Sequence, residues 1–199
     1  MARELIGKQV HYRLATAEDA SDLSRLYGYE RFPELGDPVG AFVRQMESLQ
    51  GCGYTLVASL GGGIAGAAVI RRFPENAALY PDWWIFGMLV RTRYRGAGIG
   101  QGLVRLALEK AVEEGAARVN LLVFEHNRAA VNLYRKMGFR RTSIPALDAQ
   151  LEEEVQRGER RRIIMSRPVE EDRHELKEWE DSHDRPGTNV DSLAAGGNT

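Results

Sequence analysis

Apolar residues follow two different spacings along the chain, and the change between them separates predicted helices from predicted strands. After Thr16, a good N-cap residue, apolar side chains recur at the spacing of one helix face, at Ala20, Leu23, Leu26 and Tyr27. The same spacing predicts a second helix over residues 39–49, which ends at Gly51-Cys52-Gly53. The chain therefore begins with a strand, over residues 10–14, and two helices.

Runs of β-branched, aromatic and small apolar residues predict the strands that follow. Residues 54–60 and 64–73 are separated by three glycines, which is typical of a hairpin, so the sheet begins antiparallel. Residues 83–90 form a continuous apolar run, as expected for a strand that is buried on both faces. Further strands are predicted at residues 119–124, 139–143 and 161–167.

Helical spacing returns between these later strands. One helix is predicted over residues 100–114 and ends at Gly115, and another over residues 128–137 ends at Gly138. A third, acidic helix is predicted over residues 148–156. The succession of strand, helix, strand and helix is typical of an α/β protein, so we expect a mixed central sheet flanked by helices.

Charge divides the chain into two parts. Residues 169–199 hold nine acidic and three basic side chains, whereas residues 1–168 hold 19 acidic and 24 basic ones. The net charge of −1 is therefore the sum of −6 for the C-terminal tail and +5 for the rest of the chain. The tail is too polar to bury a core of its own. We therefore predict one domain over residues 1–168 and an acidic, flexible tail over residues 169–199.

Composition also narrows the class of protein. A mildly basic body suits a small ligand that carries phosphate but lacks the basic stripe of a nucleic-acid binder. The longest apolar runs fall far short of the roughly 20 residues that cross a bilayer, and the start Met-Ala-Arg-Glu has no apolar signal core. The single cysteine, Cys52, allows neither a disulfide nor a cysteine metal site. We expect a cytoplasmic protein that binds no metal, membrane or nucleic acid.

The segment with the clearest chemistry is glycine-rich and lies between a predicted buried strand and a helix, at residues 95–102. Glycines at alternate positions let the backbone turn sharply, and the unpaired amides of a first helical turn form an anion site. A pyrophosphate is the natural ligand. The alternative is that these glycines only allow the strand and the helix to pack closely.

Two common nucleotide motifs fail on this segment. The dinucleotide fingerprint G-x-G-x-x-G requires a third glycine, but its position holds Gln101 when counted from Gly96 and Leu103 when counted from Gly98. A Walker loop requires Gly-Lys-Ser/Thr, and the chain has no lysine between Lys8 and Lys110. Phosphoryl-transfer chemistry therefore loses its main support.

Two blocks of sequence resemble the GNAT superfamily of acetyl-CoA-dependent N-acetyltransferases. The family's cofactor loop, Arg/Gln-x-x-Gly-x-Gly/Ala, is matched by Arg95, Gly98 and Gly100. Residues 127–139 match the family signature N-x-x-A-x-x-x-Y-x-x-x-G-F at every named position. The resemblance implies that strands 83–90 and 119–124 run parallel and splay apart, with the pantetheine arm of acetyl-CoA between them.

The resemblance also implies which residues bind the cofactor. Backbone groups around Leu89, those of Met88 and Val90, would pair with the pantetheine amides. The pyrophosphate would lie against the loop that follows Arg95, at the amides of Gly96, Ala97, Gly98, Ile99, Gly100 and Gln101. Asn127 would cap the next helix and touch the cofactor, beside Ala130. Lys136, with Arg135, is a candidate for the ribose phosphate, or a solvated helix charge.

Tyr134 is the predicted general acid. It lies seven residues after Asn127, on the same helix face, and in the family this tyrosine protonates the departing thiolate. An isolated tyrosine in an amphipathic helix is more often a core residue with a satisfied hydroxyl. The developing oxyanion would receive a hydrogen bond from a backbone amide near Leu89–Val90.

The base and the acceptor stay open at this stage. Candidates for the base are Glu30, Glu34 and Asp82, or a chain of waters, because Trp83-Trp84 occupies the strand position where some relatives place a glutamate. The acidic loop that holds Glu30, Glu34 and Asp37 indicates a cationic amine, and the tryptophans could wall an apolar pocket. The acceptor would be a primary amine, either of a small molecule or of a protein N-terminus or lysine.

Two other classes of protein fit parts of the pattern. A non-catalytic acyl-CoA sensor of the same fold would keep the glycine loop but need no acid, and the presence of Tyr134 argues against it. A non-catalytic interaction protein would bind its partner through the acidic tail, and the charge of that tail is the only feature that favours this class. A homodimer is left open.

Overall fold

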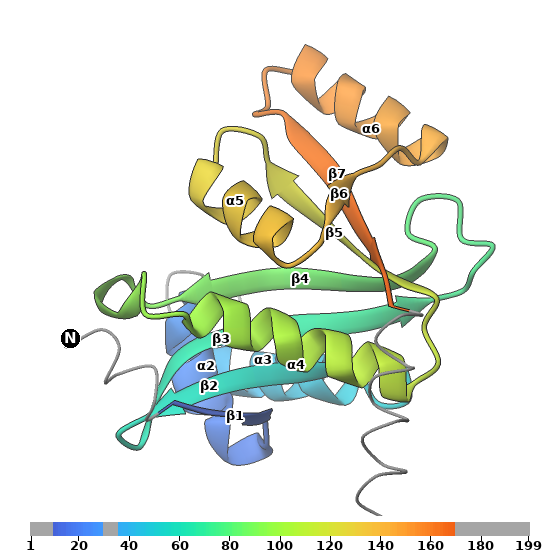
Figure 1. The fold of residues 1–199 in the computed structure, drawn as a ribbon. Helices are drawn as coiled ribbons and strands as arrows, with labels where there is room; N and C mark the ends of the chain where they lie inside the picture. The colour runs from blue at the N-terminus through green and yellow to red at the C-terminus, as the bar shows by residue number, and fades with distance from the viewer. Residues whose placement is uncertain (1–9, 30–35, 170–199) are drawn as a thin grey trace, which may run out of the picture.

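The computed structural model describes residues 10–29 and 36–169, which form a mixed seven-stranded sheet with helices on both faces (Figure 1). The strands are β1 (His11–Leu14), β2 (Gly53–Leu60), β3 (Gly63–Phe73), β4 (Asp82–Val90), β5 (Arg118–Phe124), β6 (Arg140–Arg141) and β7 (Arg162–Pro168). The helices are α2 (Ala20–Tyr27), α3 (Pro38–Glu47), α4 (Ile99–Glu113), α5 (Arg128–Lys136) and α6 (Pro145–Gln156), with the 3-10 turns η1 (Ala17–Asp19) and η4 (Thr92–Tyr94). The α/β class predicted from the sequence is confirmed.

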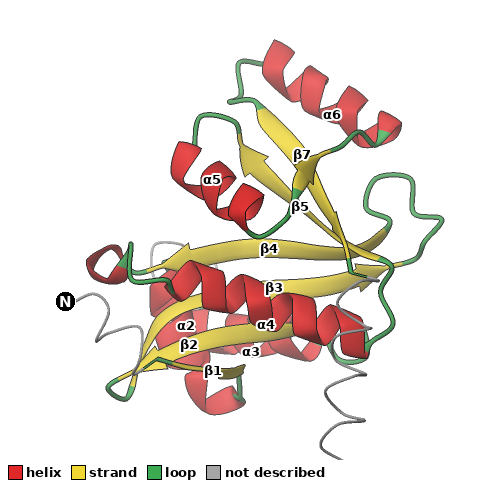
Figure 2. Ribbon diagram, viewed as in Figure 1, coloured by secondary structure: helices red, strands yellow, loops and turns green. Residues whose placement is uncertain are grey.

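The strands lie in the order β1-β2-β3-β4-β5-β7-β6. Strands β1 to β4 pair antiparallel, β4 pairs parallel with β5, and β7 pairs antiparallel with both β5 and β6. Helix α4 lies on one face of β2–β4, and α2 with α3 lies on the other (Figure 2). The sheet therefore has two hydrophobic cores on its N-terminal half, one under each layer of helices.

Strands β4 and β5 pair only at one end. Residues 83–85 face residues 119–121 in register, and beyond Ile85 the two strands diverge (Figure 1). The divergence begins at a β-bulge, because two residues of β4, Gly87 and Met88, face Ala68 alone on β3. Gly87 has φ +54°, which glycine adopts without a steric penalty. The predicted splay of the two parallel strands is present.

Trp83 and Trp84 belong to the core, which confirms the predicted burial of this end of the strand and not the alternative that the two side chains wall a pocket. Trp83 is 2% exposed and packs in the core under α4. Trp84 is fully buried in a third cluster, with Leu147 and Leu151 of α6 and with Ile164. The reason is that α6 packs on the far half of the sheet and covers this end of β4.

Two element boundaries differ from the predictions for local reasons. Strand β6 has two residues instead of five, since Phe139 turns into the core and is fully buried. The predicted tail begins one residue too early, because Val169 is fully buried and its amide donates to the Ala117 carbonyl at 3.1 Å. Residues 170–199, which form the rest of the predicted tail, lie outside the described residues.

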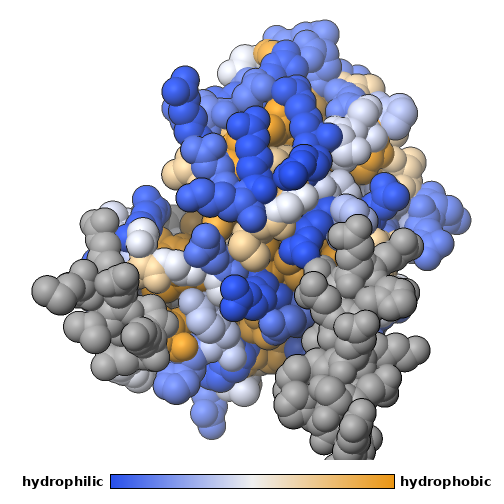
Figure 3. All heavy atoms as spheres, in the orientation of Figure 1, coloured by the Kyte–Doolittle hydropathy of each residue, from blue (hydrophilic) through white to orange (hydrophobic). Residues whose placement is uncertain are grey.

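Hydrophilic side chains cover much of the part of the molecule where α5, β6 and α6 lie (Figure 3). Within the described residues, no helix is both long and apolar enough to span a membrane.

Candidate functional site

A cavity of about 520 Å³ opens where β4 and β5 diverge. Its walls come from the end of β4, the loop that precedes α4, the first turn of α4 and the start of α5. The lining residues are Met88, Leu89, Val90, Tyr94, Arg95, Gly96, Gly98, Ile99, Gly100, Gln101, Asn127, Ala129, Ala130 and Leu133. The structure thus gathers around one cavity most of the residues that the sequence predicts for cofactor binding. Ala97 and Lys136 are the two that do not line it.

The N-terminus of α4 forms one end of this cavity. Gly96 and Gly98 have φ values of +80° and +82°, so the chain turns in a conformation that other residues rarely adopt. Gly98 is the N-cap residue and has no side chain to cap the helix, and within the described part of the chain no other side chain accepts a hydrogen bond from the amides of the first turn. Helix geometry leaves these amides without partners inside the helix. The turn therefore presents unpaired N–H donors and the positive end of the helix dipole.

Gly100 keeps the cavity open beside this turn. A Cβ atom at Gly100 would lie 3.0 Å from Cδ2 of Leu133, so that side chain would have to move by a few tenths of an ångström, and 3.9 Å from Cε of Met88, an ordinary contact. The glycine therefore allows α4 to approach α5 closely. Gly98 therefore shapes the turn and Gly100 provides close packing, while binding of a pyrophosphate by this loop stays a prediction.

The open edge of β4 forms a second wall. The Arg91 amide donates to the Ala65 carbonyl of β3 at 2.9 Å. Because backbone groups alternate in direction along a strand, the N–H and C=O of Val90 point the other way, toward the gap. The Val90 carbonyl accepts a hydrogen bond from Nε of Arg95 at 3.2 Å, which agrees with that direction. Backbone donors and acceptors at this end of β4 are therefore available to a ligand.

Asn127 fixes the start of α5 at the cavity. Its side-chain oxygen accepts a hydrogen bond from the Ala130 amide at 3.2 Å, so it is the N-cap of the helix. Ala130 lines the cavity one turn further on. The capping role predicted for Asn127 is present in the structure, and a role in ligand contact stays a prediction.

Tyr134 is more deeply buried than its predicted role suggests. It is 6% exposed, packs edge-on against Phe139 with the ring centroids 5.8 Å apart, and does not line the cavity. Burial raises the pKa of its hydroxyl to about 12. At physiological pH the hydroxyl therefore keeps its proton, so it can donate a hydrogen bond or the proton itself but cannot act as a base.

Asp82 lies at the paired end of β4, far along the strand from the cavity. Its φ is +66°, and its carboxylate accepts a hydrogen bond from the Arg118 amide at 3.2 Å. Burial raises the pKa of this carboxyl. Asp82 does not line the cavity, and its hydrogen bond holds β4 to the start of β5.

The predicted acidic loop is only partly described. Glu30 and Glu34, the other candidate bases, lie outside the described residues. Asp37 is the N-cap of α3 and accepts a hydrogen bond from the Gly40 amide at 2.9 Å. Its carboxylate is exposed and caps the helix, and the cationic acceptor that the acidic loop indicates stays a prediction. Among the described residues, no group of three or more His, Cys, Asp or Glu side chains could hold a metal ion.

Tyr27 is a polar residue that the sequence analysis assigned only to packing. Its hydroxyl is buried and has no hydrogen-bond partner among the described residues, and burial raises its pKa. A Cβ atom at Gly87 would lie 3.4 Å from the Tyr27 ring. An unpaired hydroxyl therefore lies beside the bulge of β4, on the face that α2 covers.

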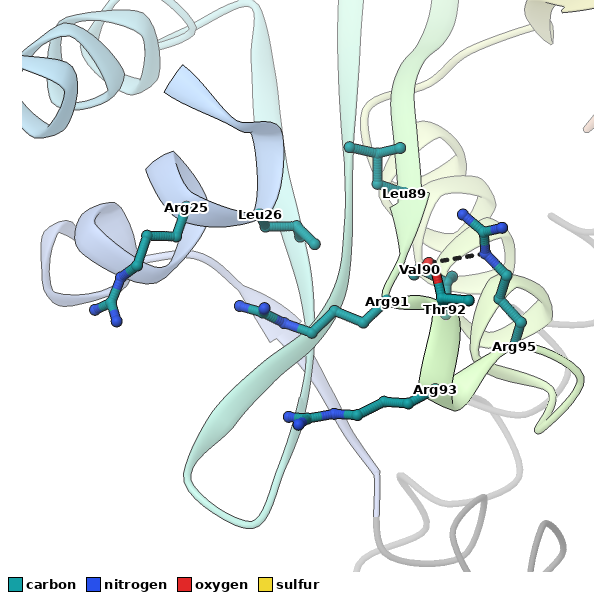
Figure 4. Close-up of a pocket in the computed structure, with 8 residues that line it drawn as sticks. All are labelled: Arg25, Leu26, Leu89, Val90, Arg91, Thr92, Arg93 and Arg95. Carbon is teal, nitrogen blue, oxygen red and sulfur yellow. Dashed lines mark hydrogen bonds between the residues drawn. The ribbon is translucent and has the colours of Figure 1, made fainter. Parts of the chain in front are cut away.

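A second cavity, of about 390 Å³, lies beside the first at the end of β4 (Figure 4). It is lined by Arg25, Leu26, Leu89, Val90, Arg91, Thr92, Arg93 and Arg95. The sequence analysis missed it, because Arg91, Arg93 and Arg95 lie in and around the 3-10 turn η4, where the two-residue period of a strand does not tell which side chains gather.

Comparison with known families identifies the chain. The model of the acetyltransferase (GNAT) family matches residues 17–139, which is more than half of the chain. The described sheet, its splayed strands and the glycine loop all fall largely within this match. The protein therefore belongs to the GNAT family of acetyltransferases.

Individual relatives agree with this assignment but cover less of the chain. N-acetyltransferase 8 of Mus musculus is 31% identical over 101 residues, 51% of this chain and 44% of that protein. The thialysine N-epsilon-acetyltransferase of Sus scrofa is 31% identical over 67 residues, 31% of this chain and 39% of that protein. The matched segments thus span less than half the length of these curated relatives.

Solved structures support the fold. The crystal structure of a GNAT-family acetyltransferase from Streptococcus pneumoniae aligns with a TM-score of 0.59 at 22% identity, covering 80% of this chain and 99% of that one. An N-acetyltransferase from Staphylococcus aureus Mu50 aligns with a TM-score of 0.61 at 14% identity, covering 81% of this chain and 99% of that one.

Proposed function

We propose that this GNAT protein transfers the acetyl group of acetyl-CoA to a primary amine, by direct attack while both substrates are bound. The observation that carries the proposal is the single cavity that joins the open edge of β4 to the uncapped N-terminus of α4. The open edge of β4 offers hydrogen bonds like those of a neighbouring strand, and the N-terminus of α4 offers an anion site. This combination suits a ligand with amides in one part and phosphates in another. Acetyl-CoA has both parts.

The residues at the cavity fit this ligand in a definite order. The outward carbonyl of Val90 and backbone groups of Met88, two residues earlier, would pair with the pantetheine amides, which leaves the Val90 amide for the thioester carbonyl. The pyrophosphate would lie against the amides from Gly98 to Gln101. The side chain of Arg95, which now donates to the Val90 carbonyl, would contribute charge close to the phosphates.

Acetyl-CoA supplies an acetyl group activated as a thioester, and the protein has to manage protons and charge. An ammonium has no lone pair, so it loses a proton to a base before attack, and the nitrogen loses a second proton as the amide forms. Of the amides at Leu89 and Val90, only that of Val90 faces the gap. An outward amide of this strand end would stabilise the oxyanion.

Tyr134 would assist departure of the sulfur. A free thiol has a pKa of about 8.5, whereas burial raises the pKa of the Tyr134 hydroxyl to about 12. Complete proton transfer to the thiolate is therefore uphill, and the main contribution of the tyrosine would be a hydrogen bond to the sulfur. The base stays unassigned, with Glu30, Glu34 and a chain of waters as candidates.

A thiol-release assay with acetyl-CoA and a panel of amines tests the proposal. We expect release that depends on the amine, and the name of the thialysine N-epsilon-acetyltransferase relative supports an amine acceptor. A sensor of the same fold would bind acetyl-CoA without releasing thiol. Release that is equal with and without every amine would overturn the proposed function.

Thermal unfolding with acetyl-CoA tests the cavity itself. A ligand that binds only the folded state raises the melting temperature. Gly98→Glu should abolish this shift, because the new side chain places bulk and negative charge at the anion site. Gly62→Glu is the matched control, since Gly62 has a similar φ of +81° but lies in the open turn between β2 and β3. Equal shifts in both variants would contradict the assignment.

A further inference from the structure

The second cavity lies on the other side of β4 from α4. Met88 and Val90 pack toward the core under α4, while Leu26 and Tyr27 pack in the core under α2. Nε of Arg91 donates to the carbonyl of Ile64, whose side chain belongs to the α2 core. The cavity thus opens on the face of the sheet that α2 covers, opposite the helix whose N-terminus forms the anion site.

Four arginines surround this cavity. In Figure 4, Arg91 and Arg93 extend in the same direction, toward α2 and Arg25, whereas Arg95 points to the other side of the strand. Arg25 is paired with Asp22 at 3.2 Å. Nε of Arg91 donates a hydrogen bond to the Ile64 carbonyl at 2.6 Å, and the guanidinium of Arg93 lies 4.7 Å from the centre of the Tyr94 ring. The charge is therefore concentrated on the wall nearest the end of β4.

Among the described residues, the positive charge of Arg91, Arg93 and Arg95 has no carboxylate partner. Within residues 10–29 and 36–169, no carboxylate lies within salt-bridge distance of Arg91, Arg93 or Arg95. Like charges around one cavity repel each other, and the repulsion is relieved when an anion binds between them. Guanidinium groups also match carboxylate and phosphate in geometry. The cavity is therefore suited to an anionic group.

The two cavities meet at the end of β4. Leu89, Val90 and Arg95 line both of them, so a molecule in the arginine-lined cavity lies next to the strand end at which the acetyl group would be presented. Leu26 and Leu89 add apolar wall between the charged groups. A volume of about 390 Å³ suits a small molecule with a short carbon chain.

We propose that the arginine-lined cavity binds an anionic group of the acceptor, so that the enzyme acetylates amines that also carry a carboxylate or a phosphate. This inference rests on the proposed function and names its substrate class. It adds an anionic group to the cationic amine that the acidic loop indicates, and that earlier prediction stays open. The competing source of the anion is a phosphate of the cofactor itself.

Matched pairs of amines test the substrate class. L-lysine is compared with 1,5-diaminopentane, and O-phosphoethanolamine with ethanolamine, in the thiol-release assay. We expect at least one anionic member to be used about tenfold better, in kcat/KM, than its partner without the anion. Acetylation of the amines without such a preference would overturn the inference and leave the proposed function standing.

Arginine variants test the cavity. Arg93→Gln removes one charge from an exposed side chain and should raise KM for the preferred anionic amine by about ten- to a hundredfold, with kcat less affected. Arg25→Gln is a second variant on the opposite wall. Arg72→Gln is the control, because Arg72 is an exposed arginine of the same sheet at the paired end of β4. Equal effects of Arg93→Gln and Arg72→Gln would overturn the assignment.

A binding measurement separates this inference from the proposed function. Orthophosphate is titrated into protein saturated with coenzyme A, and we expect binding that Arg93→Gln weakens about tenfold and Arg72→Gln leaves unchanged. Binding of orthophosphate without acetylation of any amine would reject the proposed function but keep the anion site. Competition between orthophosphate and coenzyme A, or weaker coenzyme A binding in Arg93→Gln, would assign the arginines to the cofactor and overturn the inference.

Discussion

The two ends of β4 differ in what surrounds them. At Trp83–Ile85 the strand pairs with β3 and with β5, and both tryptophans are buried under helices. At Met88–Val90 the strand pairs with β3 alone, and Leu89 is 36% exposed. One strand therefore supplies a core at one end and a binding surface at the other. The difference comes from a missing strand partner and not from a change in polarity, because both ends are apolar in sequence.

Replacement of Trp84 by alanine should give the largest loss of stability and would show how much the paired end supports. Truncation of a fully buried tryptophan typically costs about 3–5 kcal/mol in the free energy of unfolding. Leu89→Ala, at the open end, should cost less than about 1 kcal/mol. Chemical denaturation measures both, and a similar loss in the two variants would remove the contrast between the ends.

Tyr134→Phe should lower turnover about tenfold, and at most a hundredfold, while leaving the fold and acetyl-CoA affinity intact. The lower value is favoured because the raised pKa of the hydroxyl makes complete proton transfer uphill. Single-turnover rates measure the effect, with Tyr80→Phe, in the core around Trp84, as the control.

A second tyrosine, Tyr94, is an alternative candidate for the residue that assists departure of the sulfur. Tyr94 lines the cavity, whereas Tyr134 does not. A larger loss of turnover in Tyr94→Phe than in Tyr134→Phe would transfer the role to Tyr94. An unchanged rate in Tyr134→Phe would assign that side chain to packing with Phe139.

Asp19→Asn should lower the free energy of unfolding by about 1 kcal/mol at pH 7. Because Asp19 is remote from both ends of β4, this variant is a reference for the stability changes measured there. The Arg13 guanidinium, which donates to Asp19 at 2.6 and 2.8 Å, holds the pKa of this carboxyl below its usual value. A lowered pKa stabilises the fold above the unfolded-state pKa, near 3.9, and that stability is lost as the pH falls through the folded-state pKa. The difference between variant and wild type should therefore vanish in acid. A difference that persists at pH 2 would contradict this account.

Deletion of residues 170–199 should have the smallest effect and leave acetyl-CoA affinity within about twofold, since the segment is too polar to form a core. Val169 has to be kept, because it is fully buried. Removal of Val169 as well should lower the melting temperature, and an equal melting temperature in the two deletions would contradict its role in the core.

Features that depend on neighbouring residues in the sequence were the ones that could be predicted. The order of strands and helices, the turn around Gly98 and the cap at Asn127 follow from local patterns of apolar residues, glycine and asparagine. The GNAT resemblance added the splay of β4 and β5. These features need only short-range information, or a pattern that the family shares.

Features that depend on distant packing were missed or misplaced. The apolar run of β4 predicted that its tryptophans are buried, but it did not predict what covers Trp84, because α6, which buries that side chain, begins 61 residues after it. The cavity beside Arg93 requires Arg25, which α2 contributes from a part of the chain distant in sequence. Val169 follows a proline that predicts the end of a strand, yet pairing with Ala117 extends the fold by one residue.

The bulge at Gly87 also bears on solubility. An unpaired strand edge is a template on which another chain can add a strand, and such edges promote aggregation. Here the open edge is only a few residues long and lies between β5 with α5 on one side and the loop before α4 on the other (Figure 1). A thin, flexible molecule needs less space there than the edge of another sheet, with its side chains and covering helices. We therefore expect the splay to admit a ligand to β4 more readily than a strand from another copy of the protein.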